Sequence, residues 1–231
     1  MRFVSERLNK FLAARLGISR RDADEMIRNS SVKVNDRQAE LGQKIIDSDI
    51  VTVSGQQITK NAIYRYFLLH KPVGYVCSRK SQGQNPTIYS LLPTDFQQYK
   101  TVGRLDKDSS GLLILTNDGN FAHSMTHPKF LKNKTYVVNL DKPLEPLHHQ
   151  MIVDYGISLT DGLSKFQLEK IKDSPKTWKV SMSEGRNRQI RRTFQALGYK
   201  VTKLHRTGFG PYLLNDLKSG TYEEFKLTNN D

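Results

Sequence analysis

The segment from Gly103 to Gly111 combines acids and bases between two apolar stretches. Asp106 stands there between Arg104 and Lys107, and neighbouring bases favour the ionised form of a carboxylate. Loops held by strands often carry catalytic groups, and an ionised carboxylate can act as a nucleophile or a general base. The alternative is that Asp106 and Asp108 only accept hydrogen bonds from turn amides. Composition and periodicity by themselves favour this second interpretation.

Other residues are of types found in metal or cofactor sites, but the further residues that such sites require are absent from the sequence around them. His123 and His127 have the spacing of a helical zinc pair, but only Ser-Met-Thr stands between them and no third ligand is apparent. Cys77 is the single cysteine, which excludes an internal disulfide and a thiolate cluster. Gly208 and Gly210 lack the lysine and hydroxyl residue of a phosphate-binding loop. The sequence therefore predicts no metal and no cofactor.

Positive charge predominates and is unevenly distributed. The 231 residues include 36 Lys and Arg against 23 Asp and Glu, a net charge of +13, which favours a polyanionic partner. Residues 184–206 hold seven bases and one acid, and residues 1–37 hold nine bases and five acids. Such clusters suit phosphate contacts, although a solvated helix face would have the same composition.

Two short helices are expected at the N-terminus to position the first basic cluster. Ser5 would cap a helix that ends at Gly17, and its apolar face consists of Leu8, Phe11, Leu12 and Leu16. Ser19 and Asp22 have the spacing of a capping box for a second helix. Short strands are expected at 32–34 and 50–53, and the polar stretch 56–62 indicates a linker. We therefore expect domains at 1–59 and 63–231.

Strands are expected to dominate the second domain. The pattern predicts strands at 64–70, 75–76, 101–102, 112–116, 135–140 and 201–204, and helices at 121–125 and 187–196. This irregular mixture favours an α+β fold over a doubly wound sheet. The longest apolar stretches are too short to cross a bilayer, and charged residues interrupt any signal-peptide core. We expect a cytoplasmic protein that makes no contact with membranes.

Five segments, in order, resemble the motifs of the RsuA-type ribosomal pseudouridine synthases. They are residues 69–76 (LHKPVGYV), 103–119 (GRLDKDSSGLLILTNDG), 134–137 (KTYV), 184–192 (EGRNRQIRR) and 203–210 (KLHRTGFG). The segment before residue 60 resembles the small RNA-binding domain named after ribosomal small-subunit protein four. The resemblance therefore covers nearly the whole chain and reverses the preference for a structural role of Asp106.

The resemblance implies a small α/β RNA-binding module at 1–59 and a catalytic domain at 63–231 with a mixed, mainly antiparallel sheet. It implies that a specific uridine of ribosomal RNA is flipped and isomerised without a cofactor, and that Asp106 is catalytic. Tyr136 would pack against the target base, Arg191 would pair with Asp106, and Leu204 would line the pocket. Arg104 would hold the displaced strand or the opened nucleotide. Attack on the ribose and proton removal from it both remain open for Asp106.

The expected partner is ribosomal RNA, an assembly intermediate of a ribosomal subunit is a further candidate partner, and the chain is expected to be a monomer. The alternative function is a non-catalytic ribosomal-RNA-binding assembly factor with the same fold. A DNA-binding protein ranks below both, because no recognition-helix motif is present. Intact Asp106, Tyr136 and Arg191 favour the enzyme, since a pure binder gains little from an aspartate beside RNA.

Overall fold

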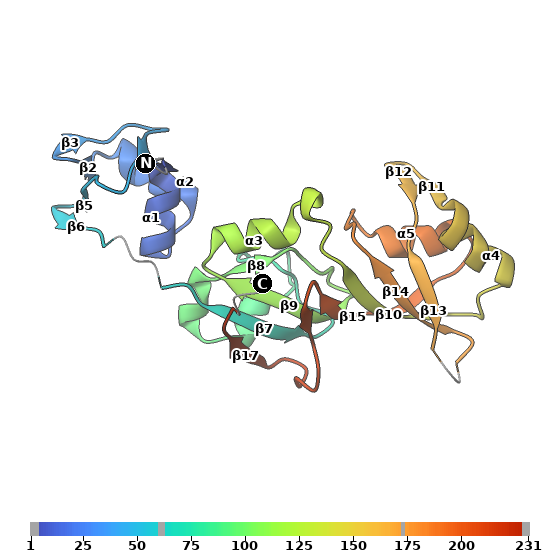
Figure 1. Ribbon diagram of the computed structural model, residues 1–231. Helices are drawn as coiled ribbons and strands as arrows, with labels where there is room; N and C mark the ends of the chain where they lie inside the picture. Colours follow the sequence, from blue (N-terminus) through green and yellow to red (C-terminus); the bar gives the residue numbers. More distant parts are fainter. Residues whose placement is uncertain (1–4, 60–62, 172–173, 228–231) are drawn as a thin grey trace. The chain divides into compact units, whose positions relative to one another are not determined.

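The computed structural model describes residues 5–59, 63–171 and 174–227, and the chain divides into two compact units (Figure 1). The first unit comprises Met1–Arg65 with Asn117–Gly119, and the second comprises Tyr66–Thr116 with Asn120–Asp231. Each unit has hydrophobic core residues of its own. The expected boundaries at 59 and 63 stay a prediction, and residues 60–62, part of the expected linker, lie outside the described residues.

The first unit packs two helices against short strands. Its elements are β1 (Glu6–Arg7), α1 (Leu8–Leu16), α2 (Arg20–Arg28), β2 (Val32–Val34), β3 (Arg37–Gln38), β4 (Lys44–Ile45), β5 (Val51–Val53) and β6 (Gln56–Gln57). Four strands form an antiparallel sheet in the order β3-β2-β5-β6, and β1 pairs with β4. The apolar faces of α1 and α2 meet the inward side chains of β2 and β5 in one buried cluster.

The helix ends follow the sequence signals only in part. The capping box of α2 is confirmed, because the Asp22 amide donates to Ser19 Oγ over 3.1 Å and the Ser19 amide donates to Asp22 Oδ2 over 2.9 Å. Gly17 ends α1 in the left-handed conformation, as predicted. The prediction that Ser5 caps α1 is wrong. The cap position is Arg7, without a side-chain hydrogen bond, because residues 6 and 7 are held extended in β1.

The predicted linker also began too early. Gln56 and Gln57 form β6, which pairs with β5 through a turn at Ser54 and Gly55. Both turn residues have positive φ, as a tight hairpin of this kind requires. The two glutamines are both exposed, so this edge strand lacks the apolar alternation by which strands are recognised.

The second unit is built on a large mixed sheet. Its strands are β7 (Tyr66–Lys71), β8 (Lys100–Val102), β9 (Ser110–Thr116), β10 (Lys134–Leu140), β13 (Gln167–Lys170), β14 (Thr177–Met182), β15 (Val201–Phe209), β16 (Tyr212–Leu213) and β17 (Tyr222–Phe225). The order is β13-β14-β10-β15-β9-β7-β17, with β8 beside β9 and β16 beside β15. Only the β9–β15 pair is parallel among the pairs described, which confirms the mainly antiparallel α+β expectation.

Helices and a small hairpin cover this sheet. They are α3 (Gly119–Thr126), α4 (Pro146–Gln150), α5 (Gln189–Ala196), a π-helical turn (Met151–Tyr155), 3₁₀ turns (Ile88–Leu91, Thr94–Gln98 and Pro128–Phe130), and the strands β11 (Ile157–Leu159) and β12 (Gly162–Ser164). On β9, Leu112 and Ile114 face a cluster that includes α3, whereas Leu113 and Leu115 face a cluster that includes the first two 3₁₀ turns. Burial on both faces explains the continuous apolar run of this strand.

The remaining differences from the sequence prediction are local. Residues 75–76 form no strand, because Val76 makes only an isolated bridge to Thr87. Helix α5 begins at Gln189 instead of Asn187, since Arg188 adopts the left-handed conformation. Strand β15 continues five residues beyond the predicted end at Leu204. In the part of the chain that the structure describes, no helix has the length and apolar character needed to span a membrane.

Candidate active site

Asp106 lies in the loop between β8 and β9, where the sequence places the candidate carboxylate. Its side chain is 32 % exposed, so it is accessible to a substrate while one part is covered by protein. The Ser109 amide donates to the Asp106 carbonyl over 3.0 Å and closes a turn around the acid. The turn hydrogen bond therefore involves the backbone oxygen of Asp106 and leaves its carboxylate available for other partners.

A buried lysine at the end of β7 holds this loop. The Lys71 side chain is fully buried, and its ammonium donates to the carbonyl oxygens of Ser109 (2.6 Å), Asp106 (3.1 Å) and Pro72 (3.0 Å). Burial lowers the pKa of Lys71, while the acids at 106 and 108 act in the opposite direction. Because one group binds several carbonyls of one loop, its loss would free the backbone that carries Asp106.

The arginine that pairs with Asp106 is Arg188. Its Nη1 lies 3.6 Å from Asp106 Oδ2 and 3.5 Å from Asp108 Oδ2, so one guanidinium bridges both acids. The expected pairing of Arg191 with Asp106 is wrong in this structure. That expectation came from the family resemblance. Arg188 precedes α5 with a φ of 47°, and this left-handed backbone conformation takes its side chain out of the helical spacing of the residues that follow it.

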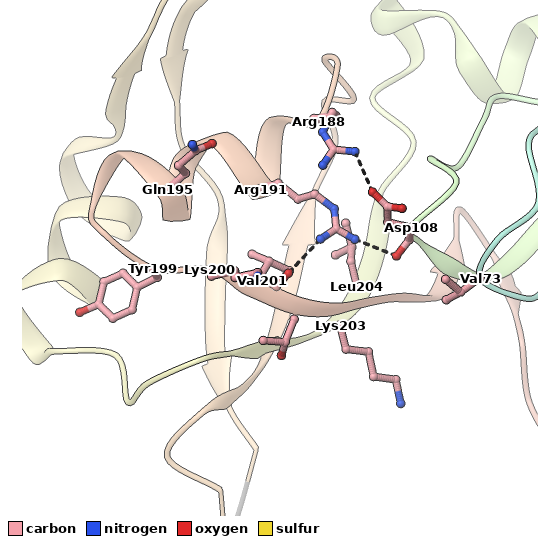
Figure 2. Close-up of a pocket in the computed structure, with 11 residues that line it drawn as sticks. Val73, Asp108, Arg188, Arg191, Gln195, Tyr199, Lys200, Val201, Lys203 and Leu204 are labelled. Atoms are coloured by element: carbon pink, nitrogen blue, oxygen red, sulfur yellow. Dashed lines mark hydrogen bonds and ion pairs between the residues drawn. The ribbon is translucent and has the colours of Figure 1, made fainter. Parts of the chain in front are cut away.

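Arg191 binds the backbone of the same loop instead (Figure 2). Its Nη2 donates to the Asp108 carbonyl over 2.9 Å, and its Nη1 donates to the Val201 carbonyl over 3.0 Å. Burial lowers the pKa of Arg191, with the nearby Arg188 acting in the same direction. Arg188, directly before α5, thus contacts the acidic side chains, and Arg191, within α5, binds the backbone that positions them.

The other arginines of this basic segment serve the fold. Arg192 makes a bidentate ion pair with Asp161 at 3.0 and 2.7 Å, and Arg186 Nη1 lies 3.0 Å from the same carboxylate. The Arg192 hydrogen bond, followed by the charge of Arg186, lowers the pKa of Asp161. Arg206 is buried, and its Nε donates to the Leu112 carbonyl over 2.7 Å. These three bases are therefore not available to a phosphate chain in this structure.

Beside the loop, three apolar side chains belong to one buried cluster: Leu105, Tyr136 and Leu204, with exposed fractions of 7 %, 8 % and 7 %. Leu105 directly precedes Asp106, and Cys77 Sγ donates to its carbonyl over 3.3 Å. The predicted residues Tyr136 and Leu204 therefore share a buried cluster with Leu105, the residue before the candidate carboxylate. Tyr136 also lies within β10, where its register partner on β15 is Arg206.

Arg104 is exposed and makes no ion pair or side-chain hydrogen bond to any residue that the structure describes. Its guanidinium is free to reach a bound molecule. The structure therefore brings four of the predicted site residues to one region of the second unit: Asp106, Tyr136, Arg191 and Leu204. The fifth, Arg104, has no side-chain partner among the described residues.

A groove runs along α5 and the start of β15 beside the acidic loop. Its volume is about 820 Å³, and its lining includes Asp108, Arg188, Arg191, Lys203 and Leu204 (Figure 2). A groove of this size could accommodate part of a polymeric ligand, and its charged lining residues are four bases and one acid.

The strand that follows the loop requires a glycine. Gly111 has a φ of +107°, and a Cβ atom there would lie 2.2 Å from the Arg206 carbonyl oxygen. This is the point at which β9 and β15 pair in parallel, Gly111 opposite Arg206. Any side chain would force the strands apart and displace the start of β9 from the loop.

The structure places the two candidate zinc ligands in a different setting. The rings of His123 and His127 are 4.6 Å apart at the end of α3, and both contact Phe130. Among the described residues, no group of three or more His, Cys, Asp or Glu side chains is arranged to hold a metal ion.

Sequence reasoning missed Lys71, Cys77 and Arg188 as residues of this site. Lys71 could have been noticed, because it ends a run of residues that are otherwise apolar or aromatic, where a lysine needs buried acceptors. Cys77 and Arg188 gave no such signal. Their roles depend on contacts with residues 28 and 82 positions away, which periodicity does not contain.

Comparisons with family models, curated proteins and solved structures all find pseudouridine synthases. Residues 65–196 match the family model described as RNA pseudouridylate synthase, and residues 6–51 match that of the S4 domain. Ribosomal small subunit pseudouridine synthase A of Pasteurella multocida is 37 % identical over 94 % of each chain. Ribosomal large subunit pseudouridine synthase B of Bacillus subtilis is 36 % identical over 95 % of this chain and 91 % of the relative. A crystal structure of a pseudouridylate synthase is 33 % identical with a TM-score of 0.68, covering 95 % of this chain and 96 % of the other.

Proposed function

The chain belongs to the RNA pseudouridylate synthase family and carries an S4 domain, and from this membership we propose that it isomerises a specific uridine of ribosomal RNA, with Asp106 as the catalytic carboxylate. The observation that carries the proposal is the position of Asp106. It is accessible in the middle of the loop between β8 and β9, whose carbonyls bind Lys71 and Arg191, and the preceding Leu105 belongs to the same buried cluster as Tyr136 and Leu204. A loop used only for folding would not need such support around an accessible acid.

The reaction conserves every atom of the nucleotide. The bond from N1 of uracil to C1′ of ribose breaks, the base turns, and a bond from C5 to C1′ forms. The proton of C5 leaves and N1 gains a proton, so no oxidant, reductant or added group is required. This balance is the reason that we propose a mechanism without a cofactor, with Asp106 acting directly on the nucleotide.

The side chains around Asp106 have separate roles in this proposal. Arg188 keeps a positive charge beside the carboxylate, with its Nη1 3.6 Å from Asp106 Oδ2. Arg191 positions the loop through the Asp108 carbonyl. Tyr136 would pack against the base once it has left its stack, a step that costs a few kcal/mol. Since the ring is buried in the free chain, contact with the base would require the buried cluster to open at Tyr136.

The proposed substrate class is ribosomal RNA in the cytoplasm, free or in an assembly intermediate. The relatives named for the small and the large subunit match this chain with nearly equal identity, 37 % and 36 %. The S4 domain supports an RNA substrate, and the exposed bases Arg20, Arg21 and Arg28 of α2 would contact RNA phosphates.

The test uses transcripts of both ribosomal RNAs that carry tritium at C5 of uridine. The purified chain should release tritium from one of them, to the extent of about one uridine per molecule, and mapping the product should locate pseudouridine at one position. Release from neither transcript nor from either RNA in isolated subunits would contradict the proposal and favour the non-catalytic assembly factor.

A further inference from the structure

The groove beside the active site extends well beyond the residues that the proposed reaction uses. Asp108 and Arg188 lie at one end of it, and Gln195 and Tyr199 lie at the other (Figure 2). Between these ends the lining continues along the first residues of β15, from Val201 to Leu204. The groove therefore leads away from the catalytic loop over a distance of several residues of an extended strand.

Its charge is strongly unbalanced. Arg188, Arg191, Lys200 and Lys203 line it, and Asp108 is the one acid among the lining residues. Lys200 and Lys203 are both exposed, and neither ammonium makes an ion pair or hydrogen bond with a residue in the described ranges. This distinguishes them from Arg186 and Arg192, whose charges are compensated by Asp161. Two ammonium groups without a carboxylate partner among the described residues, on a groove that begins at the catalytic loop, are suited to a polyanion.

We propose that this groove binds the sugar-phosphate backbone of the RNA strand next to the target nucleotide, with Lys200 and Lys203 contacting its phosphates. The inference rests on the proposed function, because it assigns the strand that continues from the uridine at Asp106. Lysine is a point charge with three freely rotating donors, which suits phosphates whose position varies with sequence. The site would therefore contribute affinity and register and would not read bases.

The aromatic side chain of the groove supports contact with the backbone over contact with bases. Tyr199 is only 3 % exposed, its hydroxyl lies 2.8 Å from His148 Nδ1, and the Glu145 amide donates to that hydroxyl over 3.1 Å. The ring is thus fixed in the core and offers no face to a base. Grooves that bind bases of single strands usually present exposed aromatic rings, whereas electrostatic contacts alone suffice for tracking phosphates.

The test compares the full-length chain with Lys200→Gln/Lys203→Gln, using a fluorescein-labelled 12-nucleotide oligouridylate between 50 and 200 mM salt. The control is Lys170→Gln/Lys218→Gln, which removes the same charge from exposed positions of the same unit that do not line the groove. For a single strand, each lost phosphate contact should reduce the slope of log affinity against log salt concentration (the salt slope) by about 0.7. The salt slope of the groove variant should therefore be smaller than that of the wild type by about 1.4. The ratio of wild-type affinity to variant affinity should therefore fall about sevenfold as the salt concentration rises from 50 to 200 mM. Thermal unfolding confirms that each variant is folded.

The inference would be overturned if the groove variant had the salt slope of the wild type. It would also be overturned if the salt slope of the control variant were reduced as much as that of the groove variant. A 12-residue oligoglutamate that competes as well as unlabelled oligouridylate would also overturn it, because the groove would then accept acidic peptides equally. On tritiated ribosomal RNA, the groove variant should show its defect as a raised KM. If the wild type releases no tritium, the proposed function fails; if only the oligouridylate result is negative, the groove assignment fails alone.

Discussion

At the scale of single residues, different bases of the candidate active site bind the acidic side chains and the backbone of the loop. Arg188 faces two carboxylates at 3.5 and 3.6 Å, distances at which a partly exposed pair contributes modestly to stability. Lys71 and Arg191 instead bind carbonyl oxygens of the loop. Catalysis depends on geometry within fractions of an ångström, so the two backbone-binding residues should matter for rate more than their charge alone suggests.

Lys71→Met should therefore lower kcat by about 100-fold, because the loop carbonyls lose their shared donor and Asp106 loses its fixed position. We expect the variant to fold, since removal of a buried charge offsets part of the cost of the unpaired carbonyls. Single-turnover release of tritium measures the effect, and Lys218→Met, an exposed lysine of the same unit, is the control. Wild-type kcat in Lys71→Met would show that the loop is positioned without this residue.

At the scale of elements, local patterns predicted the strands and helices whose burial is regular. β9 and β10 appear where apolar runs and alternation placed them, and α2 begins with the predicted capping box. The sequence did not predict the full length of β15, because its burial pattern is irregular and a register shift interrupts its pairing with β10. Nor did it predict that β9 and β15 pair in parallel, which is a contact between residues 95 positions apart.

The same limit applies to the candidate site. The resemblance named Asp106, Tyr136, Arg191 and Leu204, and the structure brings them to one region of the second unit. The partner of Asp106 could not be read from spacing, because one left-handed residue before α5 decides which arginine reaches the acid. Contacts fixed by tertiary packing are not encoded in local periodicity.

The β9–β15 contact carries a pH-sensitive group. Ser110 Oγ lies 2.9 Å from His205 Nδ1, and burial, with His70 and Lys203 acting in the same direction, lowers the pKa of His205 below 6.5. Between the lowered value and 6.5, the unfolded chain binds more protons than the folded chain. The contribution of His205 to stability is therefore lost as the pH falls below 6.5.

His205→Gln should consequently show a smaller decrease in unfolding free energy between pH 7.5 and 5.5 than the wild type. Urea denaturation at several pH values in this range provides the measurement, and glutamine can still hydrogen-bond to Ser110. Parallel curves for the two proteins would mean that His205 titrates alike in the folded and unfolded chain.

At the scale of the whole molecule, the chain joins an S4 domain to a pseudouridine synthase domain with a separate core. Each unit carries exposed bases, on α2 in the first and in the groove of the second. Phosphate contacts from separate units add to affinity and increase the dependence of binding on salt. The first unit should therefore contribute to RNA binding without taking part in the chemistry.

Removal of residues 1–59 should weaken binding to ribosomal RNA transcripts and reduce the salt slope, because the phosphate contacts of the first unit are lost. The thermal unfolding transition of the remaining unit is the control for its fold. Filter binding at several salt concentrations measures the slope, and equal affinities of the two proteins at every concentration would exclude the first unit as an RNA anchor.

The most direct measurement compares Asp106→Asn with Asp108→Asn, because both acids contact Arg188 and only one is assigned to the chemistry. Tritium release from C5 of uridine in ribosomal RNA is followed in single turnover, with RNA affinity measured alongside. Asp106→Asn should lose at least about a thousandfold in rate while still binding RNA, and Asp108→Asn should remain within about tenfold of the wild type. Comparable rates in the two variants would contradict the assignment of Asp106 as the catalytic carboxylate.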